Sequence, residues 1–369
     1  MSYGTVNADV IGTSVAGSNI GAGNASIMKN RIINGAMVIS QRNGTSSVSN
    51  PNQYVLDRFY SASLTATNAV QQSTTAPTGF TNSYYYNVGA TTGNPAAANN
   101  VYLSQVIEAN NVSDFGIGTV NASTVTVSFW VRASVTGTYC LALTNGGANN
   151  NSTAATRSYV TTYSISSANT WTQITKTITL DTSGTWNNSG NGIGLTCIFD
   201  LGSGSNRQTS TLNAWQTGDY CSNSSQVNIN ATANATFYIT GVQLEVGSSA
   251  TGYEYRQYGQ ELALCLRYYY YQVIPNGNFG GTIGANQTTT VSWFPIQNVF
   301  RATPTATYSG ALSVIQGNSQ SNVTSVAALH YAQNAVNVAL TCGAILTAGY
   351  STNLYANGST SYLNLSAEL

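Results

Sequence analysis

Aromatic residues that lie close to amides and carboxylates are the side chains of this sequence best suited to bind a ligand. The stretch NAWQTGDYCSN places Trp215 near Asp219 and Tyr220, and TWNNSGNG places Trp186 among asparagines and glycines. Aromatic rings stack on the C–H faces of sugar rings, while planar amides and carboxylates bind hydroxyl groups with a defined geometry. These stretches therefore predict sugar-binding loops. The candidate glycan-binding residues are Trp186, Trp215, Asp219, Tyr220, Tyr84 and Tyr85.

The same kinds of residue also have a structural interpretation. Trp186 and Trp215 would suit the ends of a β-sandwich, where bulky rings cover the core. The YYYY cluster at residues 268–271 suits a contact between subunits, because tyrosine buries a large area and keeps a hydroxyl for hydrogen bonding. The predicted oligomer-contact residues in this region are Leu262, Leu266, Tyr269 and Tyr270.

Groups that could catalyse a reaction are few. His330 is the sole histidine, so a Ser-His-Asp or Cys-His arrangement would have to be centred on it. Glycan hydrolysis needs two carboxylates across a cleft, and the available acids are equally explained as turn residues or strand partners: Asp181, Asp200, Asp219 and Glu108. The five cysteines form no C-x-x-C pair, which predicts buried free thiols and no zinc or redox site. We therefore predict no enzymatic activity and no cofactor.

Charge is scarce throughout the sequence. Only 6% of the residues are charged, and 11 Lys+Arg balance 11 Asp+Glu, whereas an average soluble domain has roughly 25% charged residues. The lysines are Lys29 and Lys176 alone, so no basic stripe can neutralise nucleic-acid phosphates or bind an anionic membrane. Neither a signal peptide nor a long apolar stretch occurs. We expect synthesis in the cytoplasm, no membrane insertion and no nucleic-acid partner.

Alternation of apolar and polar residues predicts strands along most of the chain. In VTVSFWVR, the odd-numbered residues from 125 to 131 are apolar and fall on one face of a strand. Repeated half-buried strands between loops rich in Gly, Asn and Ser predict an all-β fold, with an antiparallel jelly-roll/β-sandwich domain and a smaller C-terminal β-sandwich. The exception is YGQELALCLRYYYY at residues 258–271, whose apolar spacing of i, i+3, i+4 and i+7 predicts one short connecting helix.

Changes in composition and in apolar pattern divide the chain into four predicted parts. Residues 1–28 are rich in Gly, Ala, Ser and Asn and can hardly bury a core, which suits an arm that attaches to another protein. Residues 29–257 are predicted to form the jelly-roll domain, 258–273 the helical junction, and 274–369 the C-terminal β-sandwich.

Six segments resemble those of bacteriophage tail-fibre and related virion proteins, in the order that such proteins show. They are NRIINGAMVISQRN at 30–43, YVLDRFY at 54–60, VTVSFWVRAS at 125–134, ANTWTQITKTITLDTSGTW at 168–186, ATANATFYITGVQLEVGS at 231–248 and YGQELALCLRYYYY at 258–271. The module that they form resembles carbohydrate-binding jelly rolls, in which a strand similar to TFYITGVQLE at 236–245 closes the sandwich.

The resemblance implies a virion tail fibre that adheres to host surface polysaccharide or lipopolysaccharide. It also implies a homotrimer whose N-terminal arm attaches to other tail or capsid proteins. Carbohydrate-binding jelly rolls often hold a structural calcium through an Asp where this chain has Thr240, a neutral and therefore weak ligand; the remaining weak candidates are Asp57, Asp200 and Glu245. Two alternatives stay open: a capsid-attached head fibre or decoration protein with an assembly role, and a glycan-degrading tail spike.

Overall fold

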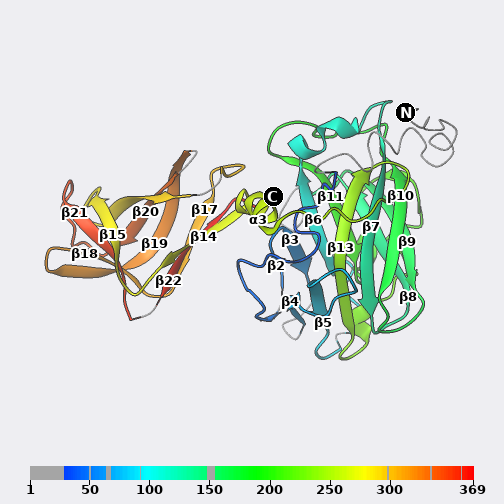
Figure 1. The fold of residues 1–369 in the computed structure, drawn as a ribbon, viewed down its shortest axis with the longest axis horizontal. Coiled ribbons are helices and arrows are strands. Elements are labelled where there is room, and N and C mark those ends of the chain that lie inside the picture. The colour runs from blue at the N-terminus through cyan, green and yellow to red at the C-terminus, as the bar shows by residue number, and fades with distance from the viewer. Residues whose placement is uncertain are drawn as a thin grey trace, which may run out of the picture. The chain divides into compact units, whose positions relative to one another are not determined.

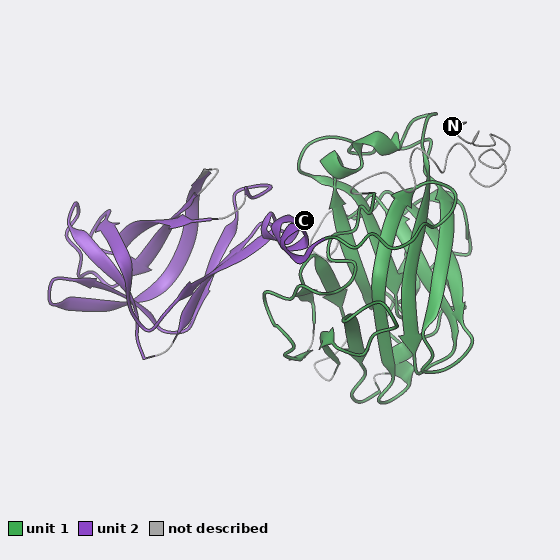
Figure 2. Ribbon diagram, in the orientation of Figure 1, with its two compact units in different colours: residues 1–256, 369 green, residues 257–368 purple. Residues whose placement is uncertain are grey.

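Strands are the predominant regular secondary structure among the described residues. The computed structural model describes residues 29–49, 51–63, 68–91, 93–147, 154–296, 299–332, 335–358 and 360–369. The chain divides into two compact units, one of residues 1–256 with Leu369 and one of residues 257–368 (Figure 2). The predicted arm of residues 1–28 lies outside the described residues. No helix among the described residues is long and apolar enough to cross a membrane.

The first unit is a sandwich of two antiparallel sheets, and most of its strands are labelled in Figure 1. Sheet A contains, in spatial order, β1 (Val48–Ser49), β4 (Ala69–Ser73), β5 (Ser83–Asn87), β13 (Thr236–Val246), β7 (Thr124–Ala133) and β10 (Thr172–Thr179). Sheet B contains β12 (Trp215–Thr217), β9 (Arg157–Ile165), β8 (Gly137–Thr144), β11 (Ile193–Asp200), β6 (Tyr102–Glu108), β3 (Phe59–Ala62) and β2 (Gln53–Leu56). Four 3-10 helices lie in the connections: η1 (Ala109–Asn111), η2 (Ser113–Phe115), η3 (Ser205–Arg207) and η4 (Ile229–Ala231).

The main core lies between the two sheets. Strand β7 buries the odd-numbered apolar side chains predicted from VTVSFWVR, and its Phe129 ring lies 5.0 Å from the Phe199 ring of β11, measured between centroids. The even-numbered residues of β7 point to the opposite face of sheet A, because side chains alternate along a strand. The all-β prediction and the jelly-roll/β-sandwich architecture of this unit are confirmed.

The second unit combines a small sheet with a closed barrel. The three-stranded sheet has the order β14 (Tyr269–Ile274), β22 (Ser361–Ser366) and β17 (Thr305–Ser309). The barrel has the order β15 (Gly277–Gly284), β16 (Thr289–Pro295), β20 (Ala335–Cys342), β19 (Ser319–Ala332), β18 (Leu312–Gln316) and β21 (Ser351–Ala356). The smaller C-terminal β-sandwich predicted for this part is antiparallel β as expected, but six of its strands form a barrel that closes on itself, which removes exposed strand edges.

The predicted connecting helix exists but is shorter than its sequence pattern suggests. Helix α3 spans Tyr258–Leu266, and the following tyrosines enter strand β14. Tyr269 pairs with Ser366 and Tyr270 with Leu365 of strand β22. The strand preference of consecutive tyrosines and this distant pairing partner therefore override the helical period at residue 269.

Candidate ligand-binding site

Trp186 and Trp215, both predicted from sequence, come together at one edge of the sandwich. Their ring centroids are 5.3 Å apart and their planes are nearly perpendicular, at 89°. The Tyr159 ring lies 5.4 Å from the Trp215 ring. Trp215 begins the edge strand β12 of sheet B, and its Nε1 donates a hydrogen bond to the Thr179 carbonyl of sheet A at 2.9 Å. Trp215 thus also ties the edges of the two sheets together.

A shallow pocket of about 510 Å³ opens beside this aromatic cluster. This volume lies within the range of roughly 300–1,000 Å³ that is typical of small-ligand sites. Its walls combine aromatic, amide, hydroxyl and charged side chains from both sheets. The lining residues that matter for binding are Arg157, Tyr159, Asp181, Ser183, Asn213 and Trp215. We call this pocket the edge pocket.

A rigid ion pair forms part of the edge pocket. The Arg157 Nε lies 2.6 Å from Asp181 Oδ2, and its Nη2 lies 3.0 Å from Oδ1. The Ser183 amide and hydroxyl each donate to Asp181 Oδ1 at 3.1 Å. Burial acts to raise the pKa of Asp181, but the hydrogen bonds from Arg157 and Ser183 outweigh it and the pKa is lowered. Asp181 is therefore an ionised, fixed acceptor.

Asn213 supplies an amide at the rim of the edge pocket. Its backbone φ is 59°, in the left-handed region that asparagine tolerates. Its Oδ1 accepts a hydrogen bond from the Thr161 hydroxyl at 2.7 Å, whereas its Nδ2 donates no hydrogen bond within the described part of the chain. The side chain is exposed. An oriented amide with an unused donor is suited to a ligand hydroxyl.

Asp219 and Tyr220 do not join Trp215, although they follow it closely in sequence. Asp219 forms an ion pair with Arg207. Tyr220 packs against an apolar cluster on the outer face of sheet B. The chain turns away after strand β12, so nearness in sequence does not place these residues at the edge pocket. Neither residue lines it.

The prediction that Tyr84 lies in a glycan-binding loop is wrong. The SYYYN stretch forms strand β5, and Tyr84 faces the core with no exposed surface. Its hydroxyl lies 2.7 Å from the Ser61 hydroxyl, and burial raises its pKa. Tyr85 points to the opposite face, where it is partly exposed and lies 4.7 Å from the Tyr238 ring.

The outer face of sheet B is covered by the chain itself. Residues 201–227, which we call the cover segment, place Leu212, Tyr220 and Cys221 over this face. The sheet contributes a buried cluster to this contact: Tyr60, Ala62, Tyr102, Val106, Cys140, Ala142, Val160 and Ile198. A ligand therefore has no access to the central strands of sheet B from this side.

The three weak calcium candidates do not form one site. Asp57 accepts hydrogen bonds from the Gln41 amide at 2.7 Å and from its side chain at 2.9 Å. Asp200 accepts from Gly202, Ser203 and Ser222 at the start of the cover segment. Glu245 accepts from Gln243, and from both the amide and the hydroxyl of Thr251. Across the described ranges, no three His, Cys, Asp or Glu side chains gather as metal ligands.

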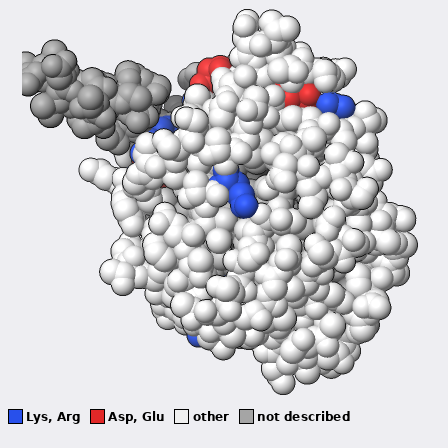
Figure 3. Space-filling model, turned by 90° about the vertical axis from the view of Figure 1, so that its right-hand side faces the viewer, with Lys and Arg blue, Asp and Glu red and all other residues white. Residues whose placement is uncertain are grey.

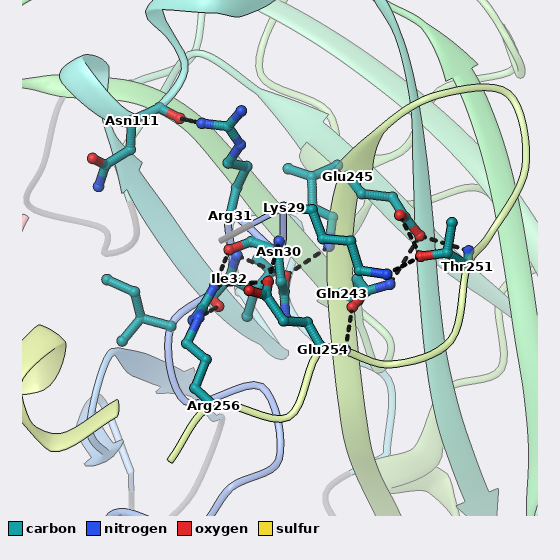
Figure 4. Close-up of polar contacts among 12 residues, drawn as sticks. Lys29, Asn30, Arg31, Ile32, Asn111, Gln243, Glu245, Thr251, Glu254 and Arg256 are labelled. Atoms are coloured by element: carbon teal, nitrogen blue, oxygen red, sulfur yellow. Dashed lines mark hydrogen bonds and ion pairs between the residues drawn. The ribbon is translucent and has the colours of Figure 1, made fainter. Parts of the chain in front are cut away.

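Charged residues also join the start of the described chain to the end of the first unit (Figure 4). Lys29 Nζ donates to the Gly252 carbonyl at 2.9 Å, and the Asn30 amide donates to Glu254 Oε2 at 2.7 Å. Arg256 lies 3.5 Å from the same Glu254 oxygen. These polar groups form hydrogen bonds and ion pairs with one another, so we interpret this group of contacts as structural. Elsewhere charge is sparse, as the molecular face in Figure 3 illustrates.

The predicted oligomer contacts divide into two pairs. Leu266 and Tyr269 are buried within the chain, and the Tyr269 hydroxyl donates to Asn364 at 2.8 Å. Leu262 and Tyr270 are partly exposed. The chain's own packing therefore buries Leu266, at the end of helix α3, and Tyr269, at the start of strand β14. Leu262 and Tyr270 remain predicted contacts.

Comparison with known proteins gives distant structural neighbours only. No family model and no curated protein sequence matches the chain. A crystal structure described as a putative sugar binding protein from Bacteroides thetaiotaomicron is 12% identical, covers 59% of this chain and 100% of its own, and has a TM-score of 0.35. The CBM22-1 xylan-binding domain of Paenibacillus barcinonensis Xyn10C is 10% identical, covers 56% of this chain and 99% of its own, and has a TM-score of 0.24.

A phage protein is also among the neighbours. The enzymatically active domain of tailspike protein 4 from bacteriophage CBA120 is 13% identical, with a TM-score of 0.30. The match covers 59% of this chain but only 22% of the tailspike chain. Structural neighbours thus include carbohydrate-binding modules, but likenesses this distant carry no argument about the function of this chain.

Proposed function

We propose that this chain is a non-enzymatic, glycan-binding fibre protein of a bacteriophage virion. In this proposal the edge pocket binds a sugar of the host surface polysaccharide or lipopolysaccharide. The observation that carries the proposal is the meeting of Trp215, Trp186 and Tyr159 with the fixed Asp181 and the open amide of Asn213. Aromatic rings and oriented polar groups are the two components that sugar recognition needs.

The polarity of the edge pocket favours a sugar over an apolar ligand. Asp181 is almost fully buried, and its oxygens already accept hydrogen bonds from Arg157, Ser183 and Trp186. It therefore fixes these polar neighbours in the wall of the edge pocket. Asn213 offers a donor on the rim. A ligand hydroxyl can accept a hydrogen bond from this amide, whereas a hydrocarbon that covered it would leave the donor without a partner at a cost in free energy.

The same pocket lacks the groups that glycan hydrolysis requires. Its lining includes one carboxylate, Asp181, which already forms the ion pair with Arg157. Retaining and inverting glycosidases use two carboxylates on opposite sides of the bond. His330 lies on strand β19 of the second unit, exposed and opposite Asn337. These observations support binding without cleavage.

The virion role rests on the sequence resemblance described above. Six segments resemble those of tail-fibre proteins and occur in the order that such proteins show; such fibres are generally trimers, and their arms attach to other virion components. We propose the same for this chain, with residues 1–28 as the attachment arm and Leu262 and Tyr270 among the subunit contacts. Three copies would add weak contacts into a strong one through multivalency.

Substitution of the pocket residues tests the proposal. Wild-type protein, Trp215→Ala and Asn213→Gly would be applied to a microbial glycan array, and the dissociation constants of the bound glycans measured. Glycine keeps the left-handed backbone of residue 213 while it removes the amide. We expect about tenfold weaker binding for Trp215→Ala, equivalent to about 1.4 kcal/mol, and a smaller loss for Asn213→Gly.

The matched control is Trp293→Ala, which removes an exposed tryptophan from strand β16 of the second unit. Its glycan binding should equal that of the wild type. Thermal melting of each variant separates lost binding from lost folding, which matters because Trp215 also bridges the two sheets. A folded Trp215→Ala protein with wild-type affinity would rule out the edge pocket, and shortening of the bound polymer would rule out the non-enzymatic role.

A further inference from the structure

A row of side chains crosses the outer face of sheet A. Strand register pairs Gln71 of β4 with Tyr85 of β5, Tyr85 with Tyr238 of β13, and Tyr238 with Arg132 of β7. Thr172 pairs with Val131, so the preceding Trp171 falls beside Arg132. Four of the five are aromatic or cationic. We call Tyr85, Tyr238, Arg132 and Trp171 the aromatic row.

The aromatic row points away from the core. Its neighbours along each strand, Tyr84, Ile239 and Val131, have no exposed surface and face sheet B. Side chains alternate along strands, so the row faces outward. All four of its members are partly exposed.

The rings of the row support one another. The Tyr85 and Tyr238 rings lie 4.7 Å apart and are tilted by 30°, and the Trp171 ring lies 6.1 Å from Tyr238. The Arg132 guanidinium carbon lies 5.0 Å from the centre of the Tyr238 ring. Contacts of this kind hold aromatic and cationic groups in place. The row is therefore an ordered surface.

Arg132 keeps part of its hydrogen-bonding capacity. Its Nε donates to the Asn169 carbonyl at 2.8 Å. Its two terminal nitrogens donate no hydrogen bond to any described residue, which leaves a planar pair of donors at the surface. The neighbouring exposed residue of β10 is Gln173, an uncharged amide. The surface thus offers rings, an amide and one cation.

We infer that the aromatic row is a second glycan-binding surface, which takes successive sugar rings of an extended chain and binds their carboxylate or hydroxyl substituents through Arg132. Adjacent strands lie about 4.8 Å apart, so the row spans about 14 Å. That length suits several linked rings. This inference rests on the proposed glycan-binding function and adds a ligand of defined shape, a polymer chain.

The row is separate from the edge pocket. Thr172 and Thr179 mark the two ends of strand β10, and the edge pocket lies at the Thr179 end. Seven residues of extended strand correspond to about 23 Å. A short oligosaccharide that fills the edge pocket does not reach the row, whereas a polymer does. The two surfaces can therefore be tested independently.

The test uses affinity electrophoresis of the full chain in gels that contain a polysaccharide. Two neutral polymers, dextran and xylan, and two uronate polymers, alginate and hyaluronan, serve as probes, together with short fragments of each. The variants are Trp171→Ala, the double variant Trp171→Ala/Tyr238→Ser, and Arg132→Gln. Trp293→Ala is the matched control, and melting curves confirm folding. Trp171 precedes the first residue of β10, so its single substitution is the variant least disruptive to the sheet.

We expect the double variant to bind at least one polymer class about tenfold more weakly, while it binds short fragments as the wild type does. If Arg132→Gln weakens binding to the uronate polymers alone, Arg132 binds a carboxylate of the ligand. If it weakens binding to the neutral and uronate polymers equally, Arg132 binds hydroxyl groups. Polymer binding that is unchanged in the double variant, or absent in the wild type, would overturn the inference. The variant Trp215→Ala separates the two proposals. If Trp215→Ala loses binding of short fragments while the row variants keep polymer binding, the edge pocket is supported as a binding site and the aromatic row is not.

Discussion

The two sheets of the first unit differ most on their outer faces. Sheet B turns Tyr102 and Ile198 into a buried cluster beneath the cover segment. Sheet A turns Tyr238 and Trp171 partly toward solvent, and within the described part of the chain no apolar cluster of this kind lies over these two rings. Further along β7 and β13, the outward-facing Thr126, Gln243 and Glu245 are buried. Both sheets pack their inner faces into one core. One outer face thus forms a second core, whereas the other leaves the aromatic row partly exposed.

This difference shows why tyrosine alone is a poor indicator of function. Tyr102 and Tyr238 lie on central strands and both point away from the shared core. Tyr102 is 3% exposed, and burial raises its pKa. Tyr238 is partly exposed and contacts an arginine. What lies above the ring, and not the residue type, decides whether it can contact a ligand.

The largest effect is expected from the matched pair Tyr102→Ala and Tyr238→Ala. Removal of the Tyr102 ring leaves a cavity under the cover segment and should lower the free energy of unfolding by about 3–5 kcal/mol. Removal of the Tyr238 ring loses cross-strand contacts only, and should cost about 1 kcal/mol or less. Urea denaturation followed by tryptophan fluorescence measures both values. Equal losses in the two variants would show that the outer faces do not differ in packing.

An opposite response to pH is expected from two carboxylates. Asp200 anchors the start of the cover segment, and burial raises its pKa despite hydrogen bonds from Ser203, Ser222 and Gly202. A raised pKa in the folded state means that the stability contributed by Asp200 is present at low pH and falls as the pH rises through that pKa. The free energy of unfolding of the wild type, relative to that of Asp200→Asn, should therefore decrease from pH 3 to pH 7.

Asp181 at the edge pocket should behave in the opposite way. Its lowered pKa means that its contribution is present above the unfolded-state value of about 3.9 and is lost as the pH falls through the folded-state value. The free energy of unfolding of the wild type, relative to that of Asp181→Asn, should increase from pH 3 to pH 7. Denaturation midpoints across this range test both signs, with Asp114→Asn as an exposed control. Slopes of the same sign for the two variants would contradict the assigned environments.

Much of the fold could be predicted from local pattern. The alternation in VTVSFWVR identified the buried face of β7 because each strand position there is consistently apolar or polar. The pattern failed at SYYYN, where three identical residues hide the alternation between the buried Tyr84 and the partly exposed Tyr85. It also failed after Leu266, because the partner strand β22 that converts Tyr269 to strand lies far away in sequence.

The site was less predictable because it depends on register. Trp186 and Trp215 were identified as loop aromatics, but their contact requires the edges of two sheets to meet. Of the aromatic row only Tyr85 was a sequence candidate, because the pairing of Tyr238 with Arg132 depends on tertiary structure. A usable signal was present: ATFYIT alternates the buried Phe237 and Ile239 with a tyrosine that must face outward.

The smallest expected effect concerns how often the cover segment detaches from sheet B in the native protein. Cys140 and Cys221 lie beneath or within the cover segment, whereas Cys197 lies in the core between the sheets. Burial raises the pKa of Cys221 to about 12, so its thiol does not react at pH 8 unless the structure opens. Segments with few core contacts open locally more often than the whole domain unfolds. We expect iodoacetamide to label Cys140 and Cys221 sooner than Cys197 in the native protein.

Peptide mass spectrometry over a labelling time course measures the three rates, and Cys197 serves as the internal reference for global unfolding. Faster labelling of Cys140 and Cys221 would show that the cover segment detaches while the sandwich stays folded. The outer face of sheet B would then be exposed transiently in the native protein. A single common rate would mean that the cover opens only with the whole unit. In that case the outer cluster of sheet B is a second core that stays closed in the native state, unlike the partly exposed aromatic row of sheet A.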